Sequence, residues 1–148
     1  MTPQLVELVA ILASTLFTGA AVYITAVEHP ARLSCGTDVA LAEWAPSYKR
    51  ATVMQVPLAL AAGVFGIVRS VQDGGPLWVL GAVLILAVIP FTLIVILPTN
   101  NRLLDRGRDR RSDDTLKLLE KWGRLHAVRS ALSLAASILF VWAAVYGG

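Results

Sequence analysis

Three residues suited to chemistry lie on one predicted helix face, directly before the last apolar run of the sequence. They are Trp122, His126 and Arg129, and their spacing of i, i+4 and i+7 places them in a row on an α-helix. An imidazole can act as a general base near neutral pH, and a permanent cation can stabilise a developing oxyanion. An indole adds an apolar wall beside them. This face is therefore predicted to form part of a site for proton transfer, with His126 as the candidate base.

Other polar residues stand at the ends of the remaining apolar runs, where a folded bundle would bring them to the same site. His29 follows the first run and is the second candidate base. The candidates for substrate contact are Trp44, Tyr48, Arg50, Gln55, Asn100 and Asn101. A metal site made of His29 and His126 with Glu28 or Asn101 stays an alternative. No metal or other cofactor is expected, because the sequence has no closely spaced set of ligands.

The composition indicates an integral membrane protein. The chain has 148 residues, of which 56% are hydrophobic, and its mean hydropathy is +0.67, which is too apolar for an ordinary soluble domain. Asp, Glu, Lys and Arg are absent from the runs 8–27, 51–68, 74–101 and 130–148. A bilayer core of about 30 Å requires roughly 20 helical residues. We therefore expect an all-α fold, a four-transmembrane-helix bundle in a single domain of residues 1–148, with spans at about 4–27, 50–70, 76–97 and 125–146.

Local signals set the expected helix boundaries. Pro30 is expected to end the first helix and Pro98 the third, because the residue before a proline avoids helical angles. A short separate helix is expected at residues 38–44, at the membrane interface. Ser112, followed by two acidic residues, is a predicted N-cap. The fourth helix should therefore begin outside the hydrocarbon and extend beyond its span.

Basic residues are distributed unevenly between the predicted loops. Of the 13 Lys and Arg residues, only Arg69 lies in the second loop, and all others lie in the first and third loops. The positive-inside rule places these two loops in the cytoplasm and both termini outside, in a cell (inner) membrane. The same arrangement explains the net charge of +3 without a nucleic-acid partner. It also places His29, Gln55, Asn101 and His126 near one membrane surface, where a bundle brings helix ends together.

Four short motifs occur in order along the chain. They are Glu28-His29-Pro30, Trp44 with Tyr48-Lys49-Arg50, Pro98-Thr99-Asn100-Asn101, and Trp122 with His126 and Arg129. In this combination the sequence resembles the anthrone oxygenase-like family of small four-helix membrane proteins. The resemblance implies a similar bundle. Named members of that family oxidise polyketide anthrones to anthraquinones with oxygen and no evident cofactor, so the resemblance also implies this class of activity.

The first functional hypothesis is a small membrane oxidoreductase, a cofactor-independent oxygenase of hydrophobic, aromatic or enolisable substrates. Such a substrate partitions into lipid and reaches the site between helices. His126 would remove a proton, and Arg129 with Asn101 or Gln55 would stabilise the resulting enolate. The tryptophans at 44 and 122 would line the pocket.

The second hypothesis is a non-enzymatic four-helix module that binds a lipid, a quinone-like molecule or a partner protein. The same residues then have structural roles: the histidines and asparagines bond to helix ends or neighbouring helices, Arg50 and Arg129 anchor the membrane surface, and the tryptophans form an interfacial belt. Small residues in the first helix allow close packing, so a homo-oligomer also stays open. The partners expected for the chain are a hydrophobic small molecule and membrane lipid.

Overall fold

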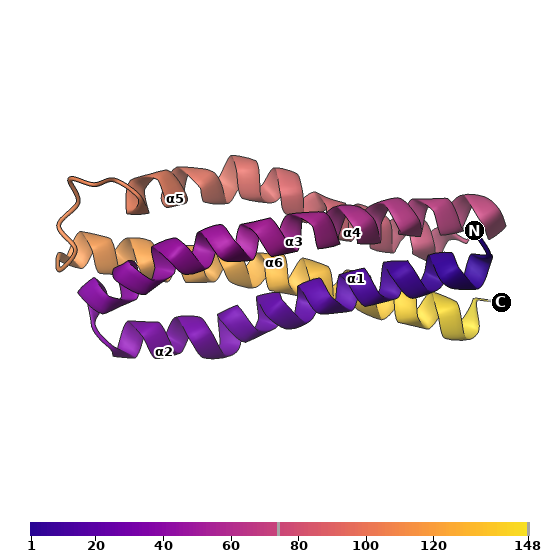
Figure 1. Ribbon diagram of the computed structural model, residues 1–148, viewed down its shortest axis with the longest axis horizontal. Helices are drawn as coiled ribbons and strands as arrows, with labels where there is room; N and C mark the ends of the chain where they lie inside the picture. Colours follow the sequence, from indigo (N-terminus) through magenta and orange to yellow (C-terminus); the bar gives the residue numbers. More distant parts are fainter. Residues whose placement is uncertain (74, 148) are drawn as a thin grey trace.

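The computed structural model describes residues 1–73 and 75–147, which form an elongated bundle of long helices (Figure 1). The first helix comprises α1 (Pro3–Tyr23), the π-helical turn η1 (Ile24–Glu28) and α2 (His29–Ser34). The second helix is α3 (Thr37–Asp73). The third comprises α4 (Pro76–Phe91), the π-helical turn η2 (Thr92–Ile96) and α5 (Leu97–Leu103). The fourth is α6 (Asp113–Tyr146). No strand occurs in the described residues. The predicted all-α four-helix bundle is confirmed.

Pro30 and Pro98 do not end their helices, so this part of the prediction is wrong. Each proline is the second residue of a short α-helix that continues directly from a π-helical turn. In η1 the backbone N–H of His29 donates to the carbonyl of Ile24, five residues earlier, and the same pattern precedes Pro98. The wider turn relieves the clash between the proline ring and the carbonyl four residues before it, which would otherwise break an α-helix.

The short helix expected at residues 38–44 is not a separate element. Its residues form the first turns of α3, which continues through Pro46 and Pro57. The connection from α2 to α3 is reduced to Cys35 and Gly36. Gly36 has a φ of +91°, a left-handed conformation that glycine adopts because it has no Cβ. This tight connection holds α2 beside the start of α3.

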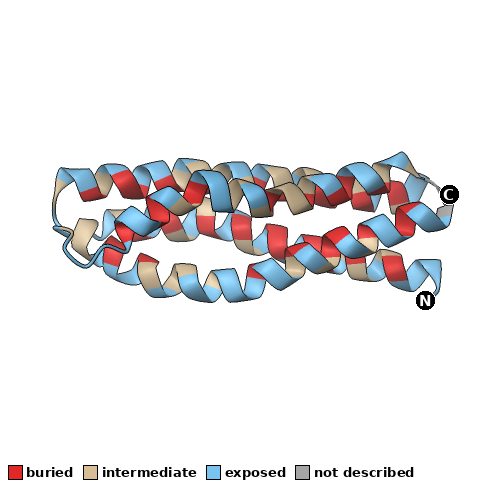
Figure 2. Cartoon of the chain, turned by 90° about the horizontal axis from the view of Figure 1, so that it is seen from above, coloured by how far each residue is buried: buried red, intermediate tan, exposed pale blue. Residues whose placement is uncertain are grey.

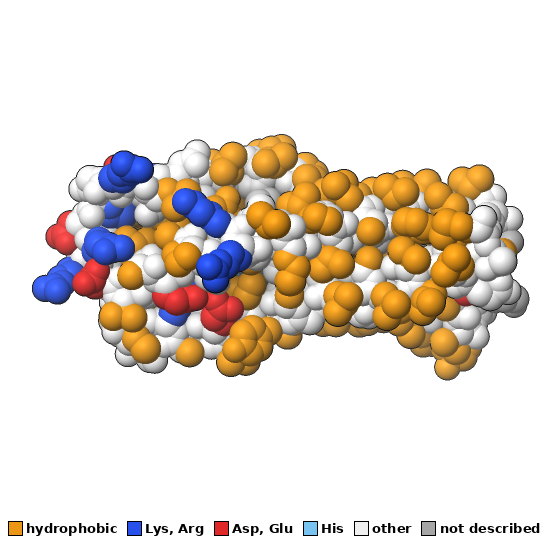
Figure 3. All heavy atoms as spheres, in the orientation of Figure 1, with side chains coloured by type: hydrophobic (Ala, Val, Ile, Leu, Met, Phe, Trp, Pro, Cys, Tyr) orange, Lys and Arg blue, Asp and Glu red, His pale blue; other side chains and the backbone are white. Residues whose placement is uncertain are grey.

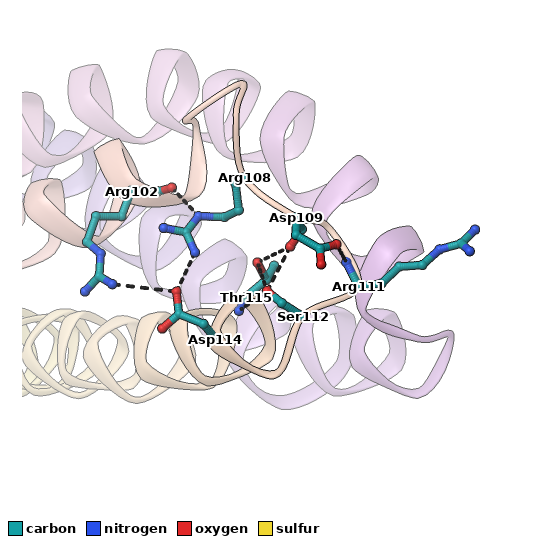
Figure 4. Close-up of polar contacts among 7 residues, drawn as sticks. All are labelled: Arg102, Arg108, Asp109, Arg111, Ser112, Asp114 and Thr115. Atoms are coloured by element: carbon teal, nitrogen blue, oxygen red, sulfur yellow. Dashed lines mark hydrogen bonds and ion pairs between the residues drawn. The ribbon is translucent and has the colours of Figure 1, made fainter.

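The start of α6 agrees with the sequence prediction. The Oγ of Ser112 accepts a hydrogen bond from the backbone N–H of Thr115 (3.2 Å), and two acidic residues occupy the first turn. Figure 4 shows how the preceding loop folds onto this turn. Arg108 donates to Asp114 (2.6 Å), and the hydroxyl of Thr115 donates to the carbonyl of Asp109 (2.7 Å). These contacts fix the charged loop against the start of the helix.

Four described helices are long and apolar enough to cross a membrane: Pro3–Ser34, Thr37–Gln72, Pro76–Leu103 and Asp113–Tyr146. Charged side chains gather at the end of the bundle that carries the loop between α5 and α6, which we call the charged end, and apolar side chains cover the rest of the visible face (Figure 3). Both termini lie at the opposite end (Figure 1). The 34 residues of α6 span about 51 Å, longer than a hydrocarbon core of about 30 Å, so its predicted extension is confirmed. Gly74, in the turn expected before α4, lies outside the described residues.

Two apolar clusters fill the interior of the bundle, and Figure 2 shows buried positions along the facing sides of the helices. Toward the termini, small residues allow close packing: a Cβ on Gly66 or Gly81 would lie 2.7 Å or 2.6 Å from the ring of Phe140. Toward the charged end, the second cluster contains Trp44 and Trp122. The predicted site residues lie in and around this second cluster.

Candidate functional site

The indole of Trp122 on α6 contacts both histidines of the chain. Its ring centroid lies 5.0 Å from that of His29 at an interplanar angle of 55°, and 4.8 Å from that of His126 at 28°. Trp44 on α3 makes an edge contact with the same indole at 5.8 Å, and Tyr48 stacks on Trp44 at 5.2 Å. Five predicted site residues therefore form one aromatic cluster between α2, α3 and α6.

His29 is fixed by one hydrogen bond and by a glycine on the facing helix. Its Nε2 lies 3.0 Å from the carbonyl oxygen of Leu119, which can only accept, so Nε2 carries the proton. The lone pair of the neutral ring is then on Nδ1, which is buried without a hydrogen-bond partner among the described residues. A Cβ at Gly123 would lie 2.6 Å from Cδ2 and Nε2 of His29, so a glycine is needed to leave room for the ring.

Two hydroxyl groups define the orientation of the buried His126. Its Nδ1 lies 3.0 Å from Oγ1 of Thr25, which lies 2.8 Å from Oγ of Ser130. Ser130 donates to backbone carbonyls, of which that of Ala21 is the nearest (2.9 Å). Its oxygen therefore accepts from Thr25, and Thr25 in turn accepts from Nδ1–H of His126. The neutral imidazole keeps its lone pair on Nε2, which has no hydrogen-bond partner within the described part of the chain.

Arg129 lies one turn beyond His126 and connects α6 to α3. Its Nη2 donates to Oε1 of Gln55 (2.9 Å), and its guanidinium lies 5.6 Å from the centroid of the Phe17 ring. Nε of Arg129 and Nε2 of Gln55 are buried, and neither has a hydrogen-bond partner among the residues that the structure describes. A buried cation with an unused donor can hold an anionic oxygen.

The predicted catalytic face borders a small inner cavity. Tyr48, Gln55, Trp122, His126 and Arg129 are among its lining residues, and its volume is about 10 Å³, room for about one water molecule. An open groove of about 510 Å³, which we call the outer groove, lies between the first helix and α3. Gln55 lines both spaces. Its side chain therefore lies where the outer groove meets the inner cavity.

Comparison with known proteins identifies the family. Residues 44–139, more than half of the chain, match the sequence profile described as anthrone oxygenase. The chain belongs to the anthrone oxygenase family. It is 32% identical to the anthrone oxygenase nsrD of Aspergillus novofumigatus over 145 residues, which cover 90% of each chain. It is 29% identical to an anthrone oxygenase of Claviceps purpurea over 93% of this chain and 87% of the relative. No solved structure matches the chain significantly.

Not every predicted site residue of this anthrone oxygenase family member lies near the inner cavity. Asn101, expected to stabilise an enolate, is exposed, and Arg50 is exposed at the outer groove. Asn100 is fully buried, and neither atom of its side-chain amide has a hydrogen-bond partner in the described chain. Because α5 continues past Pro98, successive residues point about 100° apart, so Asn100 turns inward and Asn101 outward. Of the two residues expected to assist Arg129, only Gln55 contacts it.

Glu28 does not join the histidines as a third ligand. Its carboxylate pairs with the buried Arg32, which also pairs with Glu43 (2.6 Å), and Ser47 donates to Glu28 (2.7 Å). Among the described residues, no group of three or more His, Cys, Asp or Glu side chains is arranged to hold a metal ion.

The sequence prediction missed this ion-pair network and the two hydroxyls beside His126. It places Arg32 in a loop, because Pro30 is expected to end the helix. The available signal is the i, i+4 spacing of Glu28 and Arg32, which brings opposite charges together on a continuous helix. Thr25 and Ser130 carry no comparable signal, since their chemistry depends on a contact between helices far apart in sequence.

Proposed function

We propose that this protein is a cofactor-independent oxygenase acting on an enolisable aromatic ketone such as an anthrone. The observation that carries the proposal is that His126, whose Nε2 has no hydrogen-bond partner among the described residues, lines the same cavity as Arg129. A base and a cation on one cavity can remove a proton and hold the negative charge that results. The relatives named anthrone oxygenases support the substrate class.

The first chemical step is proton removal. Nε2 of His126 takes a proton from the acidic methylene group of the anthrone, and the electron pair moves to the ketone oxygen, giving an enolate. The unused donors of Arg129 and Gln55 stabilise this oxyanion in a site of low dielectric constant. Nδ1–H of His126 already donates to Thr25, so the ring remains oriented while Nε2 becomes protonated.

The second step is reaction with dioxygen. The enolate transfers one electron to dioxygen, and the resulting radical and superoxide combine through a new carbon–oxygen bond. The peroxide anion takes the proton from the His126 imidazolium. Loss of water from this hydroperoxide breaks the O–O bond, removes the second methylene hydrogen and leaves a carbonyl. One methylene group and one dioxygen thus give one carbonyl group and one water, so the balance requires no further oxidant or reductant.

The outer groove is the proposed docking space for the substrate. Its volume of about 510 Å³ lies within the range of small-molecule sites, about 300–1,000 Å³. Tyr23 and Met54, which line it, are 56% and 49% exposed, so the groove opens on the outer surface of the bundle. Because the inner cavity holds about one water, a tricyclic substrate reaches His126 only when side chains between the two spaces move aside. Gln55 is one of the residues that line both spaces, with Ile24, Ser47 and Ala51.

The test is turnover by the variant His126→Gln. Glutamine has similar bulk and can donate to Thr25, but its amide cannot act as a base. With an anthrone in vesicles or mild detergent, we expect formation of the anthraquinone to fall by at least about a hundredfold. Circular dichroism and thermal unfolding in detergent should remain close to those of the wild type, because the helix contacts are kept.

Two results would contradict the proposal. Wild-type turnover by His126→Gln would remove His126 as the base, and a loss confined to His29→Gln would assign that role to His29. A wild-type protein that binds an anthrone but never oxidises it under oxygen would instead support the non-enzymatic module.

A further inference from the structure

A second internal cavity adjoins the inner cavity at Arg129. Its volume is about 100 Å³, and it lies among α1, α3, α6 and the helix formed by α4, η2 and α5. Tyr48, Thr52 and Arg129 line both cavities. We call the second space the apolar cavity, since the rest of its lining is mainly aliphatic and aromatic and includes Phe17, Ala59, Val88, Ile89 and Leu93.

Both threonine hydroxyls of the apolar cavity are already used within their own helices, so its remaining polar side chains are those of Tyr48 and Arg129, on the wall shared with the inner cavity. Thr52 donates to the carbonyl of Tyr48 (2.9 Å), and Thr92 donates to the carbonyl of Val88 (2.7 Å). A buried water needs two to four polar partners, whereas apolar cavities of comparable size stay dry and bind small apolar molecules. Away from that wall the apolar cavity therefore suits a small uncharged ligand, and it is too small for a tricyclic anthrone.

We propose that the apolar cavity is the dioxygen site of this protein, an inference that rests on the proposed oxygenase function. Dioxygen is a small apolar molecule of the class that such cavities hold. Val56 and Leu93 line the cavity and are 39% and 59% exposed on the outside of the bundle. These two side chains therefore stand between the cavity and the hydrocarbon of the bilayer, where dioxygen dissolves.

The position of Arg129 fits the electron transfer to dioxygen. The enolate in the inner cavity loses one electron, and dioxygen in the apolar cavity gains it and becomes superoxide. Arg129 lies on the wall that the two cavities share, so its positive charge stabilises the new anion. The superoxide and the substrate radical then form the carbon–oxygen bond, which consumes both.

Methyl relaxation measured by NMR tests the site without any turnover. Dissolved dioxygen is paramagnetic and speeds the relaxation of nearby methyl protons. Val88 and Ile85 are both buried on α4, at 1% and 0% exposure, but only Val88 lines the apolar cavity. In methyl-labelled protein in detergent, we expect oxygen pressure to enhance relaxation more at Val88 than at Ile85. Equal enhancement at the two residues would overturn the proposal.

A cavity-filling variant links the site to catalysis. Ala59→Leu adds three carbon atoms to the cavity wall, so it should remove the extra relaxation at Val88. It should also raise the KM for dioxygen by about tenfold or more while the KM for the anthrone stays unchanged. Val56→Phe fills the cavity from a partly exposed position. It replaces Ala59→Leu in both measurements if Ala59→Leu does not fold. Val64→Phe adds the same ring at an exposed position of α3 outside the cavity and should leave the oxygen dependence unchanged.

The outcomes separate this inference from the proposed function. If His126→Gln abolishes turnover but Ala59→Leu leaves the KM for dioxygen unchanged, the oxygenase stands and the dioxygen site is wrong. If His126→Gln turns over normally, His126 is not the base, but the oxygenase and the dioxygen site both stand. If the wild-type protein does not oxidise an anthrone, the proposed function is wrong, and relaxation at Val88 still decides whether the cavity takes up dioxygen.

Discussion

The proton on His126 is placed by hydroxyl groups inside an apolar bundle. Thr25 accepts from Nδ1–H and donates to Ser130, and Ser130 donates to a backbone carbonyl. Because a carbonyl cannot pass a proton on, this chain of hydrogen bonds cannot conduct protons. It orients the ring and fixes the tautomer, so the lone pair of the neutral ring is on Nε2.

Thr25→Val should remove the hydrogen bond that fixes the tautomer of His126 while keeping the shape of the side chain. We expect turnover to fall by at least about tenfold, because the ring loses its fixed tautomer. Nitrogen-15 NMR of His126 should show a larger fraction of the ring protonated at Nε2. Thr25→Ser should restore both properties.

The matched control is Thr18→Val. Thr18 and Ser137 form a similar hydroxyl pair, with 2.9 Å between their oxygens, and connect the same two long helices without a histidine. Thr18→Val should therefore leave turnover unchanged. Equal loss of activity in Thr18→Val and Thr25→Val would reduce Thr25 to a structural role.

Spacing alone predicted that Trp122, His126 and Arg129 share a face, and the structure confirms that all three line one cavity. The role of Thr25 could not be predicted in the same way. Hydroxyls in apolar helices commonly bond to their own backbone, as Thr15 does to the carbonyl of Ile11 (2.8 Å). Nothing in the sequence distinguishes a hydroxyl residue that bonds to its own helix from one that bridges two helices.

At the scale of the elements, the continuation of the first helix past Pro30 decides what the site contains. α2 carries His29 to the indole of Trp122 and Arg32 to its two carboxylate partners. The sequence could not predict this continuation, because apolar periodicity reports α-helical turns and not the i→i+5 turn that accommodates a proline. The start of α6 was predictable, because Ser112 caps it through a short-range contact.

Gly123→Ala tests how closely α2 and α6 must approach. A Cβ at this position would lie 2.6 Å from the His29 ring, so the imidazole must move and lose its hydrogen bond to Leu119. We expect a loss of about 1–3 kcal/mol in stability, measured by unfolding in detergent. Gly19→Ala is the control, because nothing lies within 4 Å of its added Cβ. It should be neutral or stabilising by up to about 1 kcal/mol, and a similar effect at both positions would contradict the close packing at His29.

At the scale of the whole molecule, the number of helices was predictable because each uncharged run is long enough to cross a bilayer. The uneven distribution of basic residues predicts the orientation, with the charged end in the cytoplasm. The site lies toward that same end, so the orientation also decides which side of the membrane holds His29 and His126.

The single cysteine provides a direct measurement of orientation. Cys35 is exposed in the short connection between α2 and α3. A membrane-impermeant thiol reagent should label it in inside-out vesicles and not in intact cells. In the variant Thr2→Cys with Cys35→Ser, labelling should occur from the outside. Labelling of Cys35 in intact cells would reverse the predicted orientation.

The outer groove opens on the surface of the bundle beside Tyr23 and Met54. If the groove is the docking space, as proposed, we expect a lipophilic substrate to be encountered in two dimensions rather than in solution. The rate then depends on the mole fraction of substrate in the bilayer. At a fixed, subsaturating amount of anthrone, doubling the phospholipid in vesicles should nearly halve turnover per protein, and a constant mole fraction should keep it unchanged. A rate set by aqueous concentration alone would exclude access from lipid. Surface dilution would make the extent of membrane, as much as the supply of substrate, a determinant of flux through this protein.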